Sequence, residues 1–200
     1  MVGGLRLRNM RERILEISKL DGNSHIGSAI GIYETLKTIE GQIQPQDIVV
    51  LDGAHGSLGY FVWLEETKGF DAHKLHKDHG THQHRDPEHD IEVSGGSLGL
   101  ASGVALGRAL ANKERNVWLV TTDGSMAEGI NWEVLRIKAD MKVDNLKVVV
   151  SANGWGAYGE ISTDVLEKRI HAFCPDALIV RVNTDFDGSE GQMAHYGKIK

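Results

Sequence analysis

The chain has 200 residues, enough for one well-buried α/β domain, and 40% hydrophobic with 25% charged residues is ordinary for a globular protein. Its formal net charge of −6, without a stripe of Lys and Arg, argues against a nucleic-acid-binding surface. The single cysteine, Cys174, excludes a disulfide within the chain, and no run of about twenty apolar residues predicts a membrane span. We therefore expect a soluble, cytoplasmic protein.

The first part of the chain predicts two helices separated by a turn. Segment 5–20 has four arginines among apolar positions and predicts an amphipathic helix, with a membrane-surface or partner-facing helix as the alternative. The turn at 21–27 leads into a second helix, 28–40, for which Ser24 is a plausible N-cap. His25 is thereby predicted to lie at the mouth of this helix.

A strand is predicted next, at 47–52, because it is a short apolar run that ends in acidic and glycine residues. A further helix follows it. His55 lies between the two, so a second histidine is predicted just past the C-terminal end of a strand.

Segment 71–90 is polar and rich in histidine. It contains His73, His76, His79, His82, His84 and His89. Such a run invites a zinc-binding interpretation, and His73 and His76 could share a helical face. However, no cysteine is near and the histidines alternate with solvated Lys and Asp. The sequence favours a surface loop that carries one or two functional histidines.

A glycine-rich stretch, 93–99, precedes a predicted helix at 101–110. Paired glycines before a helix let the backbone approach an anion and direct N–H groups towards it, with help from the helix dipole. Many helices begin with Gly and Ser for capping reasons alone, so this stretch is also compatible with a purely structural role.

The central stretch predicts a β-α-β unit, with strands at 116–122 and 146–151 and a helix at 131–141. Asp123 and Asn153 follow the two strands. If the strands are parallel neighbours, both side chains lie at the edge of the sheet where ligands of α/β proteins collect. Carboxylate and amide oxygens suit Mg²⁺, which takes only one or two protein carboxylates. Alternatively, both residues are simple turn formers.

The late part of the chain predicts a helix at 164–173, a strand at 177–182 and a basic end without clear periodicity. No internal repeat or linker is evident. We therefore expect one α/β domain, 1–200, with three layers (α/β/α) and a mostly parallel sheet.

Four motifs in combination resemble the N-terminal, diphosphate-binding domain of the transketolase family. They are Ser24-His25-Ile26-Gly27-Ser28, Ala54-His55-Gly56-Ser57, the stretch from Ile91 to Gly99, and the stretch from Thr122 to Glu133 followed by Asn153-Gly154. The resemblance covers most of the chain and is weakest after about Gly159.

The resemblance implies a thiamine diphosphate site with Mg²⁺ or Ca²⁺. It assigns the metal to Asp123, Asn153 and the backbone carbonyl of Trp155. It assigns cofactor contacts to Gly124, His55 and the loop Gly96, Ser97 and Leu98, in addition to Asp123 and Asn153. His25, His55 and His84 would line the substrate channel, with His82 as the alternative to His84. Glu128 and Glu133 would join a carboxylate network across a subunit interface, or else form a solvated helix face.

The chain also departs from the family pattern. Thr122 replaces the first glycine of Gly-Asp-Gly, and Ser125 and Ser151-Ala152 stand where other residues are common in the family. The late Asp-Gly-His-Asp segment is not visible, and the final strand expected of the domain is not apparent. None of these changes removes a metal ligand, but they leave open a different substrate chemistry.

The family's pyrimidine-binding and C-terminal domains do not fit within 200 residues. The resemblance therefore implies the N-terminal subunit of a split transketolase, which is active only with a C-terminal partner subunit in a homodimer or heterotetramer. It would transfer a two-carbon ketol unit between sugar phosphates or related compounds. The alternatives are a subunit of a related thiamine diphosphate synthase and a non-catalytic interaction protein that retains the fold.

Overall fold

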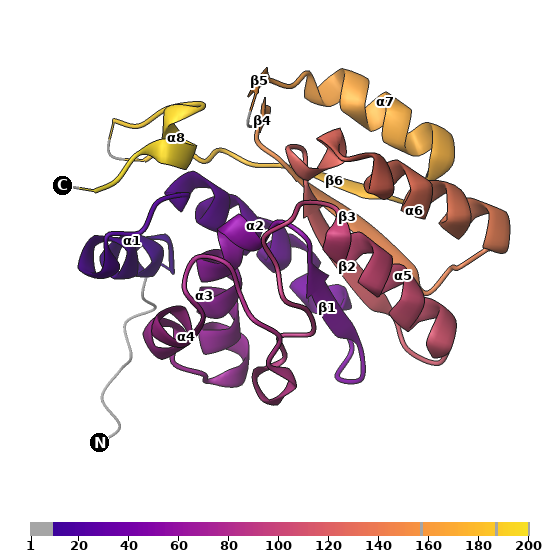
Figure 1. Ribbon diagram of the computed structural model, residues 1–200, viewed down its shortest axis with the longest axis horizontal. Helices are drawn as coiled ribbons and strands as arrows, with labels where there is room; N and C mark the ends of the chain where they lie inside the picture. Colours follow the sequence, from indigo (N-terminus) through magenta and orange to yellow (C-terminus); the bar gives the residue numbers. More distant parts are fainter. Residues whose placement is uncertain (1–9, 157, 187, 200) are drawn as a thin grey trace.

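A four-stranded parallel sheet lies at the centre of the computed structural model, which describes residues 10–156, 158–186 and 188–199 (Figure 1). The strand order is β1-β2-β3-β6, and each strand pairs in parallel with its neighbour. The strands are β1 (Ile48–Leu51), β2 (Val117–Thr122), β3 (Leu146–Ala152) and β6 (Leu178–Arg181).

The side chains of β1 and β2 are buried on both faces of the sheet. Val49 and Leu51 of β1 belong to one apolar cluster, whereas Ile48 and Val50 belong to the other, because alternate strand residues point to opposite faces. Every residue of β1 and β2 is buried, as expected for parallel strands covered by helices on both sides.

Helices cover both faces (Figure 1). Those in the first apolar cluster are α1 (Met10–Asp21), α2 (Ile26–Ile39), α3 (Ser57–Lys68) and α4 (Ala72–His79). Those in the second are α5 (Leu100–Ala111), α6 (Gly129–Met141) and α7 (Thr163–Phe173). The predicted three-layer α/β fold with a parallel sheet is confirmed. None of the helices in the described part of the chain is long and apolar enough to cross a membrane.

Helices α2 and α3 cross closely, and this crossing places their N-terminal ends side by side. A Cβ atom added to Gly59 of α3 would lie 1.9 Å from the carbonyl oxygen of Ala29 in α2, so only glycine fits there. His25 immediately precedes α2, and His55 lies in the 3₁₀ turn Ala54–Gly56 before α3. The close crossing therefore brings the two histidine-bearing ends together.

The predicted loop at 71–90 is wrong in its first half, which forms α4. Asp71 caps this helix, because its carboxylate accepts hydrogen bonds from the backbone N–H groups of His73 and Lys74 at 2.9 and 3.1 Å. Ala72 and Leu75 are buried on one side of the helix. Because only these two apolar residues lie among the histidines of this segment, the sequence shows no helical pattern there.

The predicted N-cap at Ser24 is also wrong, because α2 begins at Ile26, two residues before the predicted start at 28, and the residue directly before it is His25. His25 occupies the cap position with a left-handed backbone (φ 61°, ψ 30°), and its side chain makes no capping hydrogen bond. The helical pattern begins when Ala29 N–H donates to the carbonyl of His25, at 3.0 Å. Of the helix predicted at 5–20, residues 5–9 lie outside the described part of the chain.

A short hairpin and a short helix near the site are not predicted by the sequence patterns. Strands β4 (Trp155–Gly156) and β5 (Gly159–Glu160) pair in an antiparallel hairpin directly after Asn153. Helix α8 (Met193–Tyr196) packs against α2 near the end of the chain. Both lack a periodic apolar pattern, which is the signal used to predict the longer elements.

Candidate functional site

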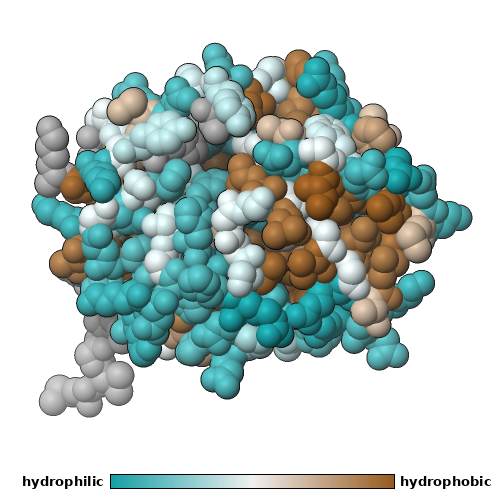
Figure 2. Space-filling view, viewed as in Figure 1, coloured by the Kyte–Doolittle hydropathy of each residue, from teal (hydrophilic) through white to brown (hydrophobic). Residues whose placement is uncertain are grey.

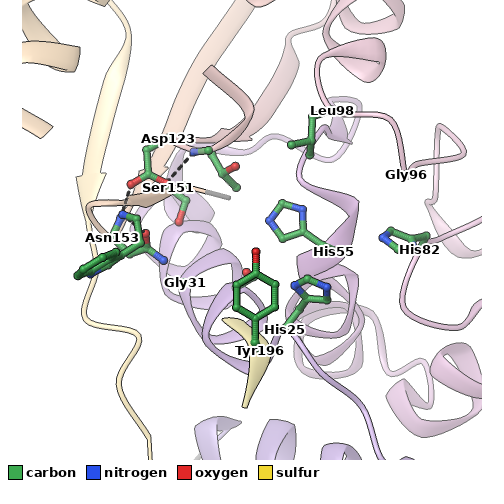
Figure 3. Close-up of a pocket in the computed structure, with 15 residues that line it drawn as sticks. His25, Gly31, His55, His82, Gly96, Leu98, Asp123, Ser151, Asn153 and Tyr196 are labelled. Carbon is green, nitrogen blue, oxygen red and sulfur yellow. Dashed lines mark hydrogen bonds between the residues drawn. The ribbon is translucent and has the colours of Figure 1, made fainter. Parts of the chain in front are cut away.

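A cavity of about 210 Å³ opens beyond the C-terminal ends of β1, β2 and β3 (Figure 3). Of the residues predicted for the site, it is lined by His25, His55, Gly96, Leu98, Asp123, Gly124, Asn153 and Trp155. The walls also include His82 and Tyr196. We refer to the part formed by Asp123, Asn153 and Trp155 as the metal end, and to the part formed by His25, His55 and His82 as the histidine end.

Asp123 is the centre of the metal end and is only 3% exposed. One carboxylate oxygen accepts a hydrogen bond from Gly124 N–H at 2.9 Å, and the other accepts from Asn153 and Gly154 N–H at 2.9 and 2.7 Å. Burial raises the pKa of Asp123 to about 6, against the opposing effect of these backbone donors. Within the described ranges no cationic side chain pairs with this carboxylate, so its charge is balanced by dipoles alone.

Asn153 and Trp155 fold back onto Asp123. The Asn153 Oδ1 atom accepts a hydrogen bond from Trp155 N–H at 2.9 Å, which makes an Asx turn. The carbonyl oxygen of Trp155 lies 3.9 Å from the position that a Cβ atom on Gly124 would take. The structure thus brings the three predicted metal ligands to one end of the cavity.

The glycine loop forms the opposite wall. Gly96 has φ +132°, a conformation that other residues rarely adopt, and a Cβ atom there would meet nothing within 4 Å. Gly96 and Leu98 both line the cavity. Ser97, predicted to contact the cofactor, is exposed and is not among the residues that line the cavity.

Asp52 is a buried acid that was not predicted, although it follows a strand just as Asp123 does. Its Oδ2 atom accepts hydrogen bonds from Gly99 N–H at 3.1 Å and from the Thr121 hydroxyl at 3.0 Å. Burial raises its pKa. Asp52 therefore connects the end of the glycine loop to Thr121 of β2, which lies two residues before Asp123.

At the histidine end, the ring centroids of His25 and His55 lie 5.6 Å apart. Burial lowers the pKa of His25, and the neighbouring charge of His82 lowers it further. The Nδ1 atom of His25 is buried without a hydrogen-bond partner in the described part of the chain. His25 is thus held in its neutral form over more of the pH range than a free histidine.

The third histidine of the cavity is His82 rather than His84. His82 lines the cavity, whereas the ring of His84 lies 6.3 Å from that of His79, and His84 is absent from the cavity wall (Figure 3). Of the two alternatives, the structure thus places His82 and not His84 in the cavity wall, and a role of either in a substrate channel stays a prediction. Although His82 and His84 are only two residues apart, only the side chain of His82 faces the cavity.

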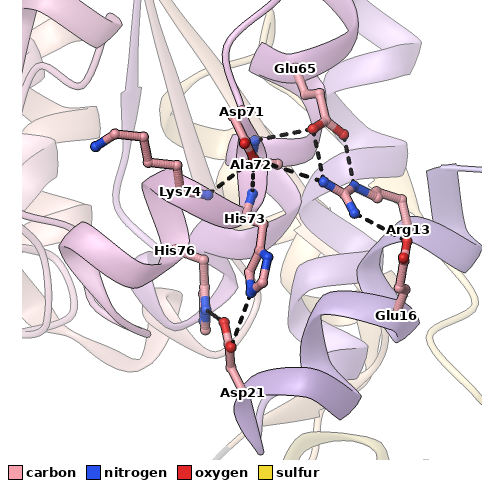
Figure 4. Close-up of polar contacts among 9 residues, drawn as sticks. All are labelled: Arg13, Glu16, Asp21, Glu65, Asp71, Ala72, His73, Lys74 and His76. Carbon is pink, nitrogen blue, oxygen red and sulfur yellow. Dashed lines mark hydrogen bonds and ion pairs between the residues drawn. The ribbon is translucent and has the colours of Figure 1, made fainter.

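Four other histidines of segment 71–90 share two aspartates. His73 and His76 lie 3.1 and 2.9 Å from the two carboxylate oxygens of Asp21, at the end of α1 (Figure 4). Two more, His79 and His89, lie 3.4 and 2.6 Å from Asp86. Among the residues described, no group of three or more His, Cys, Asp or Glu side chains has the geometry of a metal site. These histidines anchor the segment that carries His82.

Glu128 and Glu133, predicted for a subunit interface, are both exposed. Glu128 precedes α6, and Glu133 on α6 pairs with Arg136 at 3.0 Å. Neither lines the cavity. In the single chain they form part of a solvated helix face, and their role between subunits stays a prediction.

The chain matches a model of the 1-deoxy-D-xylulose-5-phosphate synthase family over residues 6–183. It is 33% identical over 150 residues to one of the subunits of an apulose-4-phosphate transketolase from Actinobacillus succinogenes, covering 66% of this chain and 53% of that protein. It is 28% identical over 152 residues to 1-deoxy-D-xylulose-5-phosphate synthase from Fusobacterium nucleatum, covering 74% of this chain and 25% of that enzyme.

Among solved structures, transketolase from Leishmania mexicana superposes with a TM-score of 0.68 at 18% identity, covering 91% of this chain and 33% of that chain. This likeness shows the fold. The chain thus spans about half the length of the first of these relatives and a smaller part of the others. Because the family model matches most of the sequence, the chain belongs to the 1-deoxy-D-xylulose-5-phosphate synthase family of transketolase-like, thiamine-diphosphate-dependent proteins.

Proposed function

We propose that the chain is the diphosphate-binding subunit of a split transketolase, which transfers a two-carbon ketol unit between sugar phosphates or related compounds. The observation that carries the proposal is the convergence of Asp123, Asn153 and the Trp155 carbonyl on one end of a cavity whose opposite wall is a glycine loop. A relative that is named as one subunit of a transketolase supports the split arrangement.

The residues at the metal end fit a diphosphate with its divalent cation. Asp123 is a buried carboxylate without a cationic partner among the described residues, which is the environment that a bound cation stabilises. Asn153 and the Trp155 carbonyl add neutral oxygens, the other ligand type that Mg²⁺ and Ca²⁺ accept. On the facing wall, the open space at Gly96 leaves room for the backbone to approach phosphate oxygens.

The histidine end would manage protons and orient the substrate. Thiamine diphosphate supplies the electron sink that amino-acid side chains lack. Imidazole is the side chain best suited to donate or accept a proton in an enzyme site, and His25, His55 and His82 supply three imidazoles at this end of the cavity. Because its pKa is lowered, His25 would act as a neutral hydrogen-bonding group that can take up a proton during the reaction.

A partner subunit would complete the site. An apolar patch extends over α5 and α6, where Leu100, Ile130 and Met141 are 56%, 39% and 57% exposed (Figure 2). Patches of this kind mark protein interfaces. The patch adjoins Glu128 and Glu133, so we assign this face to oligomer formation. The assembly would be a homodimer, or a heterotetramer with a C-terminal, pyrimidine-binding subunit. We place it in the cytoplasm.

The proposal is tested by titrating thiamine diphosphate with Mg²⁺ into the chain by isothermal calorimetry, with and without a candidate partner, and by following ketol transfer in the mixture. We expect cofactor binding and transfer that depends on the partner. Full transfer activity from this chain alone would contradict the need for a partner. No heat change under either condition would favour a non-catalytic interaction protein.

A decarboxylating synthase is the second candidate, because the matching family model describes 1-deoxy-D-xylulose-5-phosphate synthase. Such an enzyme would release CO₂ from a 2-oxo acid donor, whereas a transketolase would use a ketose donor and release none. Measuring CO₂ release by the chain mixed with its partner separates the two reactions, since both use the same cofactor site.

A further inference from the structure

A late segment of the chain crosses the edge of the cavity and adds a residue that the sequence motifs do not include. We name it the C-terminal strap and define it as residues 182–186 and 188–199. It leaves the sheet after β6, because Val182 N–H donates to the carbonyl of Ala152 at 3.0 Å, and it returns over the start of α2 through α8 (Figure 1).

The strap is fixed by close contacts with residues of the site. A Cβ atom on Gly27 would lie 2.8 Å from Cβ of Ala194, which is fully buried. A Cβ atom on Gly191 would lie 2.8 Å from the indole of Trp155. Glycine at both places lets the strap pack tightly against α2 on one side and the metal end on the other.

Polar contacts hold the first part of the strap. The Arg11 side chain of α1 donates to the carbonyl oxygen of Asp185, and the Asp185 carboxylate accepts from Gly191 N–H at 3.1 Å. The buried Thr184 hydroxyl accepts a hydrogen bond from the Asn153 side-chain amide at 3.4 Å. The strap is therefore tied both to α1 and to a predicted metal ligand.

The strap presents Tyr196 to the cavity. The Tyr196 ring lies 6.2 Å from the ring of His25, and its hydroxyl points into the cavity between Ser151 and His55 (Figure 3). This hydroxyl has no hydrogen-bond partner within the residues that the structure describes. The adjacent His25 Nδ1 is likewise unpaired. The buried His25 Nδ1 is the group that calls for a partner from outside the described chain, whereas Tyr196 is 53% exposed and offers its hydroxyl at the open side of the cavity beside it.

We propose that Tyr196 is a substrate-contacting residue that determines specificity, with its phenol hydroxyl bonding a hydroxyl or carbonyl oxygen of a polyhydroxylated substrate beside His25. This inference rests on the proposed function. A phenol suits the task because it both donates and accepts a hydrogen bond, whereas it has little to offer a divalent cation. Its place beside His25, apart from Asp123 and the glycine loop, associates it with the substrate and not with the diphosphate.

The test compares Tyr196→Phe, which removes only the hydroxyl, with Tyr158→Phe as the matched control. Tyr158 is 95% exposed and lies outside the cavity. The chain, alone and mixed with its candidate partner, is loaded with Mg²⁺ and thiamine diphosphate, titrated with ribose 5-phosphate and followed by the NMR signals of its histidine rings. Loss of one hydrogen bond is expected to weaken sugar phosphate binding about 2- to 10-fold in Tyr196→Phe. The control variant should bind like the wild type.

Cofactor affinity, measured separately by calorimetry, distinguishes the possible failures. Cofactor affinity should be unchanged in Tyr196→Phe. With a sugar phosphate analogue that lacks the hydroxyl bonded by Tyr196, the difference in affinity between the wild type and Tyr196→Phe should become smaller. Equal sugar binding by both variants, or weaker cofactor binding in Tyr196→Phe, would overturn the role of Tyr196 while leaving the proposed function intact. A wild-type chain that binds cofactor but no sugar phosphate, with or without the partner, would also overturn it. Failure to bind cofactor with or without a partner would remove the proposed function and the inference together.

Discussion

The two ends of the cavity are built in different ways. At the metal end, backbone N–H groups after β2 and β3 fix the Asp123 carboxylate through three hydrogen bonds. At the histidine end, side chains arrive from separate segments, and one of their nitrogen atoms, Nδ1 of His25, lacks a partner in the described chain. The sheet therefore pre-organises the metal end, whereas the histidine end depends on the paths of individual loops.

The largest effect is expected for Asp123→Ala. Removing the carboxylate leaves the diphosphate and its cation without their charged ligand, so the affinity for thiamine diphosphate with Mg²⁺ should fall at least about 100-fold. Calorimetry measures the loss, and a thermal melt confirms that the variant is folded. Asp123→Asn, which keeps the shape and removes the charge, should lose most of the same affinity. Binding that survives both substitutions would show that the ligand assignment is wrong.

The glycine loop should be the next most sensitive part of the site. Gly96→Ala forces a side chain into a backbone conformation with φ +132°, at a cost of about 1–3 kcal/mol, and should weaken cofactor binding about 10-fold. Gly107→Ala is the matched control, because Gly107 lies within α5 with open space around it. The control should raise the free energy of unfolding by about 0.5–1 kcal/mol and leave binding unchanged. Similar binding losses in both variants would count against a specific role for the loop.

A smaller effect is expected at the histidine end, where His82→Ala and His84→Ala form a pair. His82 lines the cavity and His84 does not, so only His82→Ala should lower kcat/KM of the reconstituted enzyme, by about 10- to 100-fold. The effect of His84→Ala should stay within about 2-fold. Equal losses, or a larger loss in His84→Ala, would contradict a specific role for His82 in the substrate channel.

The smallest effect concerns the protonation of His25. Its pKa lies below the ordinary value of 6.5, first because of burial and second because of His82. Replacing His82 with alanine removes a positive neighbour and should raise the His25 pKa, without restoring it fully because the burial remains. An NMR titration of the His25 ring measures both values. A pKa that falls or stays constant in His82→Ala would contradict the electrostatic contact.

The sequence predicts the metal end better than the histidine end, for a physical reason. Asp123 and Asn153 each follow a buried apolar run, and parallel pairing of neighbouring strands brings such positions together whatever the loops do. The choice between His82 and His84 depends instead on the position of α4 and on the aspartates that anchor its histidines, which no periodic pattern reveals. Asp52 looks like a turn residue in the sequence, and Tyr196 lies in a segment without periodicity.

The central claim is that a divalent cation binds between Asp123, Asn153 and Trp155 together with the diphosphate. Paramagnetic Mn²⁺, added with thiamine diphosphate to the ¹⁵N-labelled chain, tests this most directly because it broadens the NMR signals of nearby amides. Broadening should be strongest at Gly124, Gly154 and Trp155 and should disappear in Asp123→Ala. Broadening centred on the histidine-rich segment 71–90, with these amides unaffected, would contradict it.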